Sequence, residues 1–532
     1  MYLIYVPLDD RPCNVYYPQW IARLQPQIQL QVPPPELLGK KKQSAPIDRL
    51  WNWLEVTLEI ALRVDQNPVG ILSMEMLIYG GLLPSRLHQS SLEDLLKRLQ
   101  KLRELKKRYP GLKIFASSLI MRCPTYNSAE EEPDYYAEWG ASLFRWGWLQ
   151  DRNRDSLLTP LEQQEWRELQ QQLPAAILQD YRDRRETNLQ VNLAIIELVA
   201  EGIIHFLSMP QDDAAPAGFT RLDQRRIADE IDRQHLENRI PIYPGADEVG
   251  CTLLARAFLE NSQKTSSENQ SRNLPENLYQ NSPRIYPFYG TPIADTLIPL
   301  YEDRPVGQSV LAHIQAAGAE VALNPQEADI ILALNMPGLT MQESWEQTTK
   351  DSSYDDRNWG DFCDRIGEYL NQGKAVALAD IAFANGGETE CIQRLDQAHL
   401  LDRLVAYGGW NTCGNTLGTV IATALLGWRS SQRDAITFNL LSRLWEDWLY
   451  QSIVRQHLIR QYLPTIGASY YEFAQQDQAI AEETSRCLQQ QWSLNCQHSF
   501  QNYTIESLRI QHPWGRMFEI HLDLHLQRRT SG

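Results

Sequence analysis

The chain has 532 residues, with 50 basic and 67 acidic side chains and a net charge of -17 at pH 7. This length exceeds one ordinary hydrophobic core, so we expect about two or three domains, or one enlarged barrel. The negative charge repels phosphate backbones and anionic membrane surfaces, which argues against nucleic acid and membranes as partners.

The start of the chain, MYLIYVPLDDRPCN, has the pattern of a first strand and lacks the basic and long apolar regions of a signal peptide. No stretch approaches the roughly 18 apolar residues that a membrane helix needs. The eight cysteines are scattered without a Cys-x-x-Cys pair, which favours reduced thiols over disulfides or a thiolate zinc site. We therefore expect a soluble, cytoplasmic protein.

Short apolar runs alternate with longer amphipathic stretches along most of the chain. Helical spacing is clearest over Leu92–Tyr109 and Val306–Ala317. The expected buried strands are Tyr2–Pro7, Val69–Met74, Lys113–Leu119, Ile203–Met209, Ile240–Tyr243, Arg284–Phe288, Asp329–Leu334, Ala375–Ala379 and Leu404–Tyr407. This alternation predicts an α/β fold with mainly parallel strands, arranged as two α/β units or as a TIM-like barrel.

Composition changes along the chain indicate four regions. We predict an N-terminal α/β domain over residues 1–260, a polar linker or insertion over 261–283, a second α/β unit over 284–428 and a mostly helical region over 429–532. Within the last region, Phe518–Leu526 alternates apolar and polar residues as an edge strand does.

Polar residues follow nearly every expected strand, where ligands of parallel α/β proteins bind. Any one of them is explained by a turn or a helix cap, but their joint occurrence favours a polar site. The candidate site residues are Asp9, Asp10, Arg11, Asn14, Glu75, Arg86, Arg122, Asp212, Asp213, Asp247, Glu248, Asp380, Asn385, Trp410, Asn411 and Asn415.

The adjacent carboxyls of Asp212 and Asp213 are the candidate catalytic pair. Their mutual repulsion raises one pKa, which provides a proton donor beside a retained anion. The alternative is that Asp213 caps a helix that starts near Ala215 and Pro216.

Two other motifs have both functional and structural interpretations. Arg11 either orients the carboxylates of Asp9 and Asp10 toward a ligand or forms a structural ion pair. Trp410 is either a platform for a sugar ring, with Asn411 beside it, or a core residue. The basic run Arg182, Arg184 and Arg185 is typical of a solvated helix face.

Six motifs in order resemble the bacterial DUF4127 family, a domain of unknown function, from the first strand to about residue 428. The family has no established activity, so the resemblance implies a shared site without naming a reaction. The motifs are PLDDRPCN (7–14), MLIYGGLLPSR (76–86), QDDAAPAG (211–218), GADEVG (245–250), ADIAFANGG (379–387) and YGGWNTCGNTLG (407–418).

The pair Asp212 and Asp213 also resembles the strand-end acids of barrel glycosidases that act on N-acetylhexosaminides. This likeness implies that Asp213 protonates the leaving group and Asp212 contacts the acetamido group, or the reverse.

Three functions remain open from the sequence. The first is a glycosidase-like hydrolase acting on a small-molecule substrate, a sugar. The second is a metal-dependent hydrolase or lyase in which Mg²⁺ or Ca²⁺ is held by carboxylates, and the third is a protein that binds a polar metabolite without catalysis. No metal ligand is assigned for the first function; the carboxylates for the second are Asp9, Asp10, Asp212, Asp247 and Glu248.

Overall fold

The computed structural model describes residues 1–65, 67–269 and 282–529. The chain forms two compact units, and each is assembled from separate stretches of sequence. Unit 1 comprises Met1–Asp10, Gln27–Leu253 and Tyr301–Arg304; unit 2 comprises Arg11–Pro26, Leu254–Leu300 and Pro305–Gly532.

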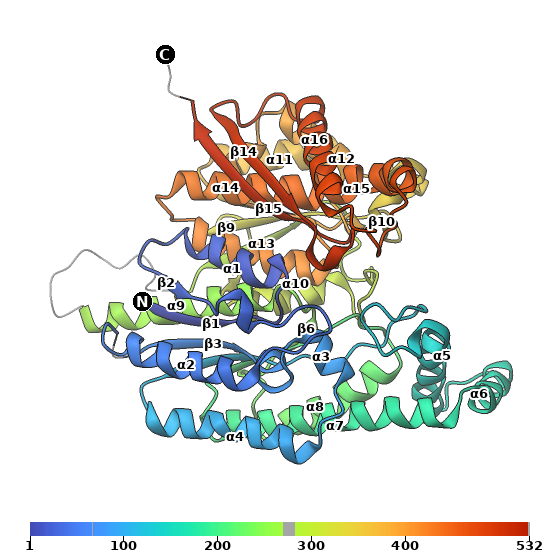
Figure 1. The fold of residues 1–532 in the computed structure, drawn as a ribbon. Helices are drawn as coiled ribbons and strands as arrows, with labels where there is room; N and C mark the ends of the chain where they lie inside the picture. Colours follow the sequence, from blue (N-terminus) through green and yellow to red (C-terminus); the bar gives the residue numbers. More distant parts are fainter. Residues whose placement is uncertain (66, 270–281, 530–532) are drawn as a thin grey trace. The chain divides into compact units, whose positions relative to one another are not determined.

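Unit 1 is built on a six-stranded parallel sheet in the order β2-β1-β3-β4-β5-β6; Figure 1 labels β1, β2, β3 and β6 of this sheet. The central strands are buried on both faces, because helices cover a parallel sheet from each side. All carboxyl ends therefore lie along one edge. The strands are β1 (Tyr2–Val6), β2 (Gln29–Gln31), β3 (Val69–Ser73), β4 (Lys113–Ser117), β5 (Phe206–Gln211) and β6 (Ile242–Pro244).

The helices of unit 1 pack by amphipathic faces. In α4, the buried leucines Leu95, Leu99, Leu102 and Leu105 recur at helical spacing, and the helix packs on α7, which also contacts α8 (Figure 1). The helical segments are η1 (Pro35–Leu37), α2 (Ile47–Ala61), η2 (Glu75–Tyr79), α3 (Leu82–Leu87), α4 (Leu92–Arg108), α5 (Tyr136–Arg154), α6 (Pro160–Gln172), α7 (Ala175–Ala200) and α8 (Phe219–Arg233).

Unit 2 has a five-stranded parallel sheet in the order β13-β11-β9-β7-β8, and β10 pairs with β12 in parallel beside it. The entirely buried helix α13 packs against β11 and β13. The strands are β7 (Arg284–Tyr289), β8 (Glu320–Val321), β9 (Ile330–Asn335), β10 (Gln342–Glu343), β11 (Ala375–Asp380), β12 (Phe383–Ala384) and β13 (Ala406–Gly408).

Several helical segments of unit 2 contact this sheet, including α10 on β8 and α11 on β11. Helix α9 (Val249–Asn269) begins in unit 1 and continues into unit 2. The others are α1 (Pro12–Ala22), α10 (Val306–Ala316), η3 (Ser344–Thr349), η4 (Ser352–Tyr354), α11 (Trp359–Asn371), α12 (Thr389–Gln397), η5 (Leu401–Arg403) and α13 (Cys413–Gly427).

The end of the chain combines helices with one antiparallel strand pair, β14 (Tyr503–Gln511) and β15 (His521–Arg528), which packs on α14 and α16 (Figure 1). The helical run from residue 444 contains two π-helical stretches, η6 and η7. The helical segments are α14 (Arg433–Arg443), η6 (Leu444–Val454), α15 (Arg455–His457), η7 (Leu458–Tyr462), η8 (Leu463–Ile466), α16 (Asp477–Asn495) and η9 (Pro513–Gly515).

The predicted fold class is confirmed: all nine expected strands form, and the two main sheets are parallel. The closed barrel is wrong, because the two main sheets are open and the other described strands form two separate pairs. The domain boundaries drawn from the sequence stay predictions, since residues 270–281 of the expected linker lie outside the described residues. In the described part of the chain, no helix is both long and apolar enough to cross a membrane.

Candidate functional site

Nine of the predicted site residues belong to unit 1, where they follow strands that are neighbours in the sheet. Glu75 follows β3, Arg122 follows β4 and Asp212 follows β5, so the sheet order places them along one edge. The nine are Asp9, Asp10, Glu75, Arg86, Arg122, Asp212, Asp213, Asp247 and Glu248. The clearest group among them is the arginine–carboxylate cluster, which we define as Arg86, Arg122, Glu131, Glu132, Asp212 and Asp213.

Arg122 uses all three guanidinium nitrogens on three different carboxylates. Nε donates to Glu132 at 2.7 Å, Nη1 to Asp213 at 2.8 Å and Nη2 to Glu131 at 2.8 Å. Its side chain is 8% exposed, so these charge-assisted hydrogen bonds are largely shielded from water. The guanidinium therefore fixes the positions of all three acids.

Arg86, at the end of α3, holds the other member of the acidic pair. Its Nη2 donates to Asp212 Oδ2, while Nη1 donates to Glu131 at 3.1 Å and to Glu132 at 3.4 Å. Asp212 and Asp213 thus have separate arginine partners, and Glu131 and Glu132 bridge the two guanidinium groups. Four carboxyls surround two cations, and this excess of acid favours retention of a proton.

Asp213 has a raised pKa. Burial raises this pKa to about 6. The positive charge of Arg122 acts to lower it, and repulsion from Asp212 acts to raise it. Its side chain keeps 19% of its surface exposed. The backbone has φ of 37°, which a non-glycine residue adopts at a cost, often at a functional position.

Asp213 does not cap a helix. Helix α8 begins at Phe219, and its N-cap is Gly218, so the interpretation of Asp213 as a cap is wrong. Its carboxyl instead forms an ion pair with Arg122.

Glu75 and Asp212 line the same small cavity. Glu75 accepts hydrogen bonds from Leu119 N at 2.7 Å and Ser73 Oγ at 3.1 Å. Burial raises its pKa to about 7, and the charge of Asp212 adds to the shift. The cavity has a volume of about 20 Å³, close to what one water molecule needs. Its polar lining consists of Glu75, Tyr79, Ser85, Arg86, Asn188, Asn192 and Asp212.

Helix α7 supports the loops that present these residues. Arg185 donates to the carbonyls of Met121 and Arg122, both at 2.8 Å, and forms an ion pair with Asp223. Arg184 is also buried, and only Arg182 of this basic run is exposed. The prediction of a solvated arginine face is therefore wrong for two of the three residues.

Two lysines hold the acidic loop that supplies Glu131 and Glu132. Lys42 Nζ donates to the carbonyls of Ala129 and Glu132, and Lys41 Nζ pairs with Glu130 at 2.7 Å. The backbone amide of Lys41 donates to Asp10 Oδ1 at 3.4 Å, so the segment that carries the two lysines also contacts the loop after β1. Asp9, also after β1, is buried.

Glu248 follows β6 and is almost completely buried. Its Oε2 accepts from Ala246 N at 2.7 Å, while Oε1 has no hydrogen-bond partner among the described residues. Burial raises the pKa of Glu248 to about 8, and the neighbouring acids Asp247 and Glu302 reinforce the shift. The Glu248 carboxyl is therefore mostly protonated at neutral pH.

Unit 2 holds a second polar cluster, at the carboxyl ends of β9 and β11. Asn335 donates to Asp380 at 2.7 Å and to Glu388 at 3.0 Å, and Arg357 binds both oxygens of Glu388. Burial raises the pKa of Asp380 to about 7, with repulsion from Glu388 as the next cause. Tyr407 also donates to Asp380.

Several other predicted residues of unit 2 have structural contacts. Asn385 and Asn411 both adopt positive φ, and Asn385 N donates to Asn411 O at 2.8 Å. Trp410 is 5% exposed and contacts the rings of Tyr17 and Phe518, so its interpretation as a core residue is supported over an open sugar platform.

The remaining three are also buried. Asn415 lies in the first turn of α13, whose N-cap is Thr412. Asn14 lies in α1, and Arg11 pairs with Glu519 at 3.9 Å and stacks on Trp514.

Sequence reasoning missed the partners that complete both clusters. Glu131 and Glu132 lie in a long loop after β4, where the run Glu130–Glu132 was the only signal. Arg357 does not follow a strand, so its position offered no signal. The same holds for a separate buried ion-pair group in unit 2, formed by Arg443, Glu446 and Asp447.

The expected carboxylate metal ligands do not converge. Among the described residues, three potential ligand atoms lie within 4.8 Å of one another only at His457, Glu483 and Cys487 in unit 2. Of the five expected ligands, Asp212 instead forms an ion pair with Arg86.

The raised pKa of Glu248 predicts a pH-dependent effect of Glu248→Gln. The folded protein keeps a proton that the unfolded chain releases near pH 4.5, so the contribution of this carboxyl to stability falls as pH rises to about 8. We expect the variant to match the wild type near pH 5 and to gain on the order of 2–4 kcal/mol relative to it at pH 8.

Urea unfolding at pH 5, 6.5 and 8 measures this difference. Glu104→Gln, at an exposed carboxyl on α4, is the matched control and should show a small difference at every pH. A Glu248→Gln variant that is less stable than wild type at pH 8 contradicts the assignment.

Comparisons with known proteins identify the family. No curated protein and no solved structure matches the chain. A family model described as "Protein of unknown function (DUF4127)" matches residues 3–523, which is nearly the whole chain. The chain therefore belongs to the DUF4127 family.

Proposed function

We propose that unit 1 is a glycosidase-like hydrolase in which Asp213 donates a proton to the leaving group. The observation that supports this proposal is the adjacent pair Asp212 and Asp213, held by two different arginines, with the pKa of Asp213 raised to about 6. A carboxyl with that pKa exists in both protonation states near neutral pH, as a general acid and base must.

The substrate class that suits the pair is an N-acetylhexosaminide. In such a reaction the acetamido oxygen attacks the anomeric carbon, and the bond to the leaving oxygen breaks as that oxygen takes a proton from Asp213. The Asp212 carboxylate, oriented by Arg86, accepts a hydrogen bond from the acetamido N–H. Water then attacks the cyclic intermediate and returns a proton to Asp213.

The order of roles follows from the two ion pairs. Arg86 also contacts Glu131 and Glu132, and it binds an Asp212 side chain that is 12% exposed. Asp213 is more open at 19%, and it has the raised pKa that a proton donor needs. We therefore assign Asp213 as the acid and Asp212 as the anion that orients the substrate.

Aryl N-acetylhexosaminides with leaving groups of graded acidity test this assignment. Asp213→Asn should lower kcat/KM by about 10²–10⁴-fold on substrates with poor leaving groups. The loss should shrink for 4-nitrophenolate, which departs without a proton. Asp212→Asn should lower the rate on all substrates to a similar extent, because the acetamido contact does not depend on the leaving group.

Glu186→Gln is the control, since Glu186 is a half-exposed carboxylate of unit 1 that pairs with Arg226. It should leave turnover unchanged. Wild-type protein that turns over none of these substrates, or an Asp213→Asn variant with a loss that is independent of the leaving group, contradicts the proposal.

A specific groove in unit 2 favours a second function, the binding of a saccharide. The groove has a volume of about 870 Å³, within the range of small-molecule sites. Trp345 lies in its wall with 39% of its surface exposed, as an aromatic platform requires, in contrast to the buried Trp410. Amide side chains of the lining include Gln347, Gln393, Gln397, Gln456, Gln491 and Asn495.

Calorimetric titration with N-acetylglucosamine oligomers tests the groove. We expect Trp345→Ala to weaken binding by about tenfold, which corresponds to about 1.4 kcal/mol. Tyr471→Ala is the control, because Tyr471 is an exposed aromatic of unit 2 outside the groove lining. If the Trp345→Ala variant and the wild type bind the oligomers with equal affinity, the groove is not the binding site.

A further inference from the structure

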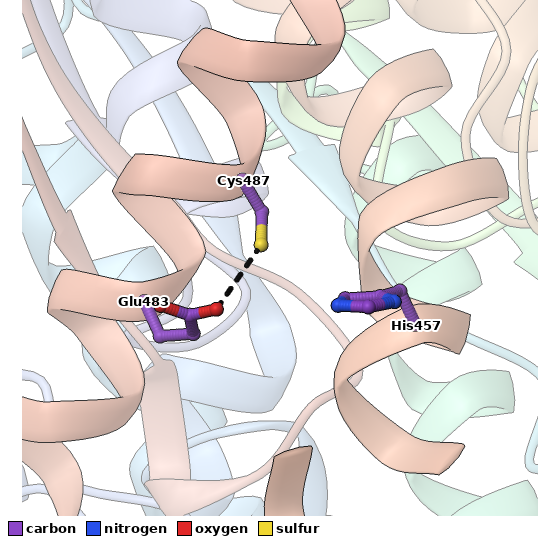
Figure 2. Close-up of side chains that lie close together, drawn as sticks. All are labelled: His457, Glu483 and Cys487. Carbon is purple, nitrogen blue, oxygen red and sulfur yellow. Dashed lines mark hydrogen bonds between the residues drawn. The ribbon is translucent and has the colours of Figure 1, made fainter. Parts of the chain in front are cut away.

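Two helical segments of unit 2 bring together a nitrogen, an oxygen and a sulfur ligand. His457 ends α15, while Glu483 and Cys487 lie four residues apart in α16 and so share one face of that helix (Figure 2). One ligand atom from each of the three lies within 4.8 Å of the others.

The spacing is close to that of a tetrahedral metal centre. With metal–ligand bonds of about 2.0–2.3 Å, the ligands of a tetrahedral zinc ion lie roughly 3.3–3.8 Å apart. Cys487 Sγ already donates to Glu483 Oε1 at 3.5 Å. The imidazole of His457 lies within 4.8 Å of the other two ligand atoms, so a shift of at most about 1.5 Å reaches this spacing, and rotation of an exposed side chain can supply it.

The helical run that carries His457 has an unusual geometry. His457 lies directly between the π-helical stretches η6 and η7. Wide π turns are rare in proteins and occur often at functional sites, where they shift side chains out of the regular helical positions.

One cation already neutralises Glu483. Arg486 donates to both carboxylate oxygens, at 2.6 and 2.8 Å, and lies 3.5 Å from Cys487 Sγ. The Arg486 side chain is 60% exposed, and exposed ion pairs contribute little to stability. A metal ion can therefore displace this guanidinium at small cost.

We propose that His457, Glu483 and Cys487 bind a zinc ion, with water as the fourth ligand, and that the ion ties α16 to the helical run of residues 444–462. The mixed donor set suits zinc, whereas Mg²⁺ and Ca²⁺ prefer oxygen ligands alone. Binding forms a zinc–sulfur bond and releases the thiol proton of Cys487 to solvent. The site is independent of the hydrolase proposed for unit 1.

The test uses full-length protein stripped with EDTA and titrated with ZnCl₂ in a calorimeter. We expect one zinc per chain and no comparable heat from MgCl₂. His457→Ala and Cys487→Ser should each weaken zinc binding by more than about tenfold, since even residues that only orient metal ligands contribute about 10–100-fold. Glu482→Gln, at the exposed neighbouring carboxylate on α16, should bind as the wild type does.

A variant that gains affinity separates metal binding from misfolding. Arg486→Ala removes the competing cation and should bind zinc several-fold more tightly than the wild type. Zinc should also slow the reaction of the Cys487 thiol with a disulfide reagent, relative to Cys487→Ser as the blank. Absence of zinc binding at micromolar concentrations, unchanged binding in both ligand variants, or weaker binding by Arg486→Ala overturns the proposal.

Discussion

The burial of more acid than base at one edge of a parallel sheet is the constraint on which the candidate site depends. Arg86 and Arg122 neutralise part of the charge of four carboxyls, and their forked geometry holds each carboxyl in a defined place. Because the cations are outnumbered, protonation of one acid relieves the remaining repulsion. Burial is the main cause of the raised pKa of Asp213, and repulsion from the neighbouring acids Asp212 and Glu131 adds to it.

The fold makes this arrangement possible. Parallel strands bring the residues after β3, β4 and β5 to one edge, and α7 secures the loops through Arg185. Unit 2 repeats the principle with different residues, since Asp380 also ends a buried strand and has a raised pKa. Both clusters lie where open parallel sheets bind their ligands, although each sheet belongs to its own unit.

Much of the fold could be predicted because its strands are short, fully buried apolar runs, such as Val69–Ser73. The members of the cluster that could be predicted lie in the segments that follow β3, β4 and β5, namely Arg86, Arg122, Asp212 and Asp213. Glu131 and Glu132 come from a loop whose path is set by tertiary contacts with Lys41 and Lys42, which no local pattern reveals.

Burial was the other quantity that local patterns could not supply. The residues near Trp410 in the sequence suit a sugar site, yet Trp410 packs against Phe518. Trp345 belongs to no motif, yet it is exposed in a groove. Arg184 and Arg185 belong to a charged run, yet the tertiary structure buries them against the loops of the site.

The central claim is that Asp213 acts as the proton donor, and the pH dependence of kcat/KM tests it most directly. On a substrate with a poor leaving group, kcat/KM of the wild type should fall about tenfold per pH unit above roughly pH 6, because the donor must be protonated. Asp213→Asn should lose this alkaline limb while remaining folded. An alkaline limb that persists unchanged in Asp213→Asn would contradict the account and assign the proton to another group, with Glu75 the first to examine.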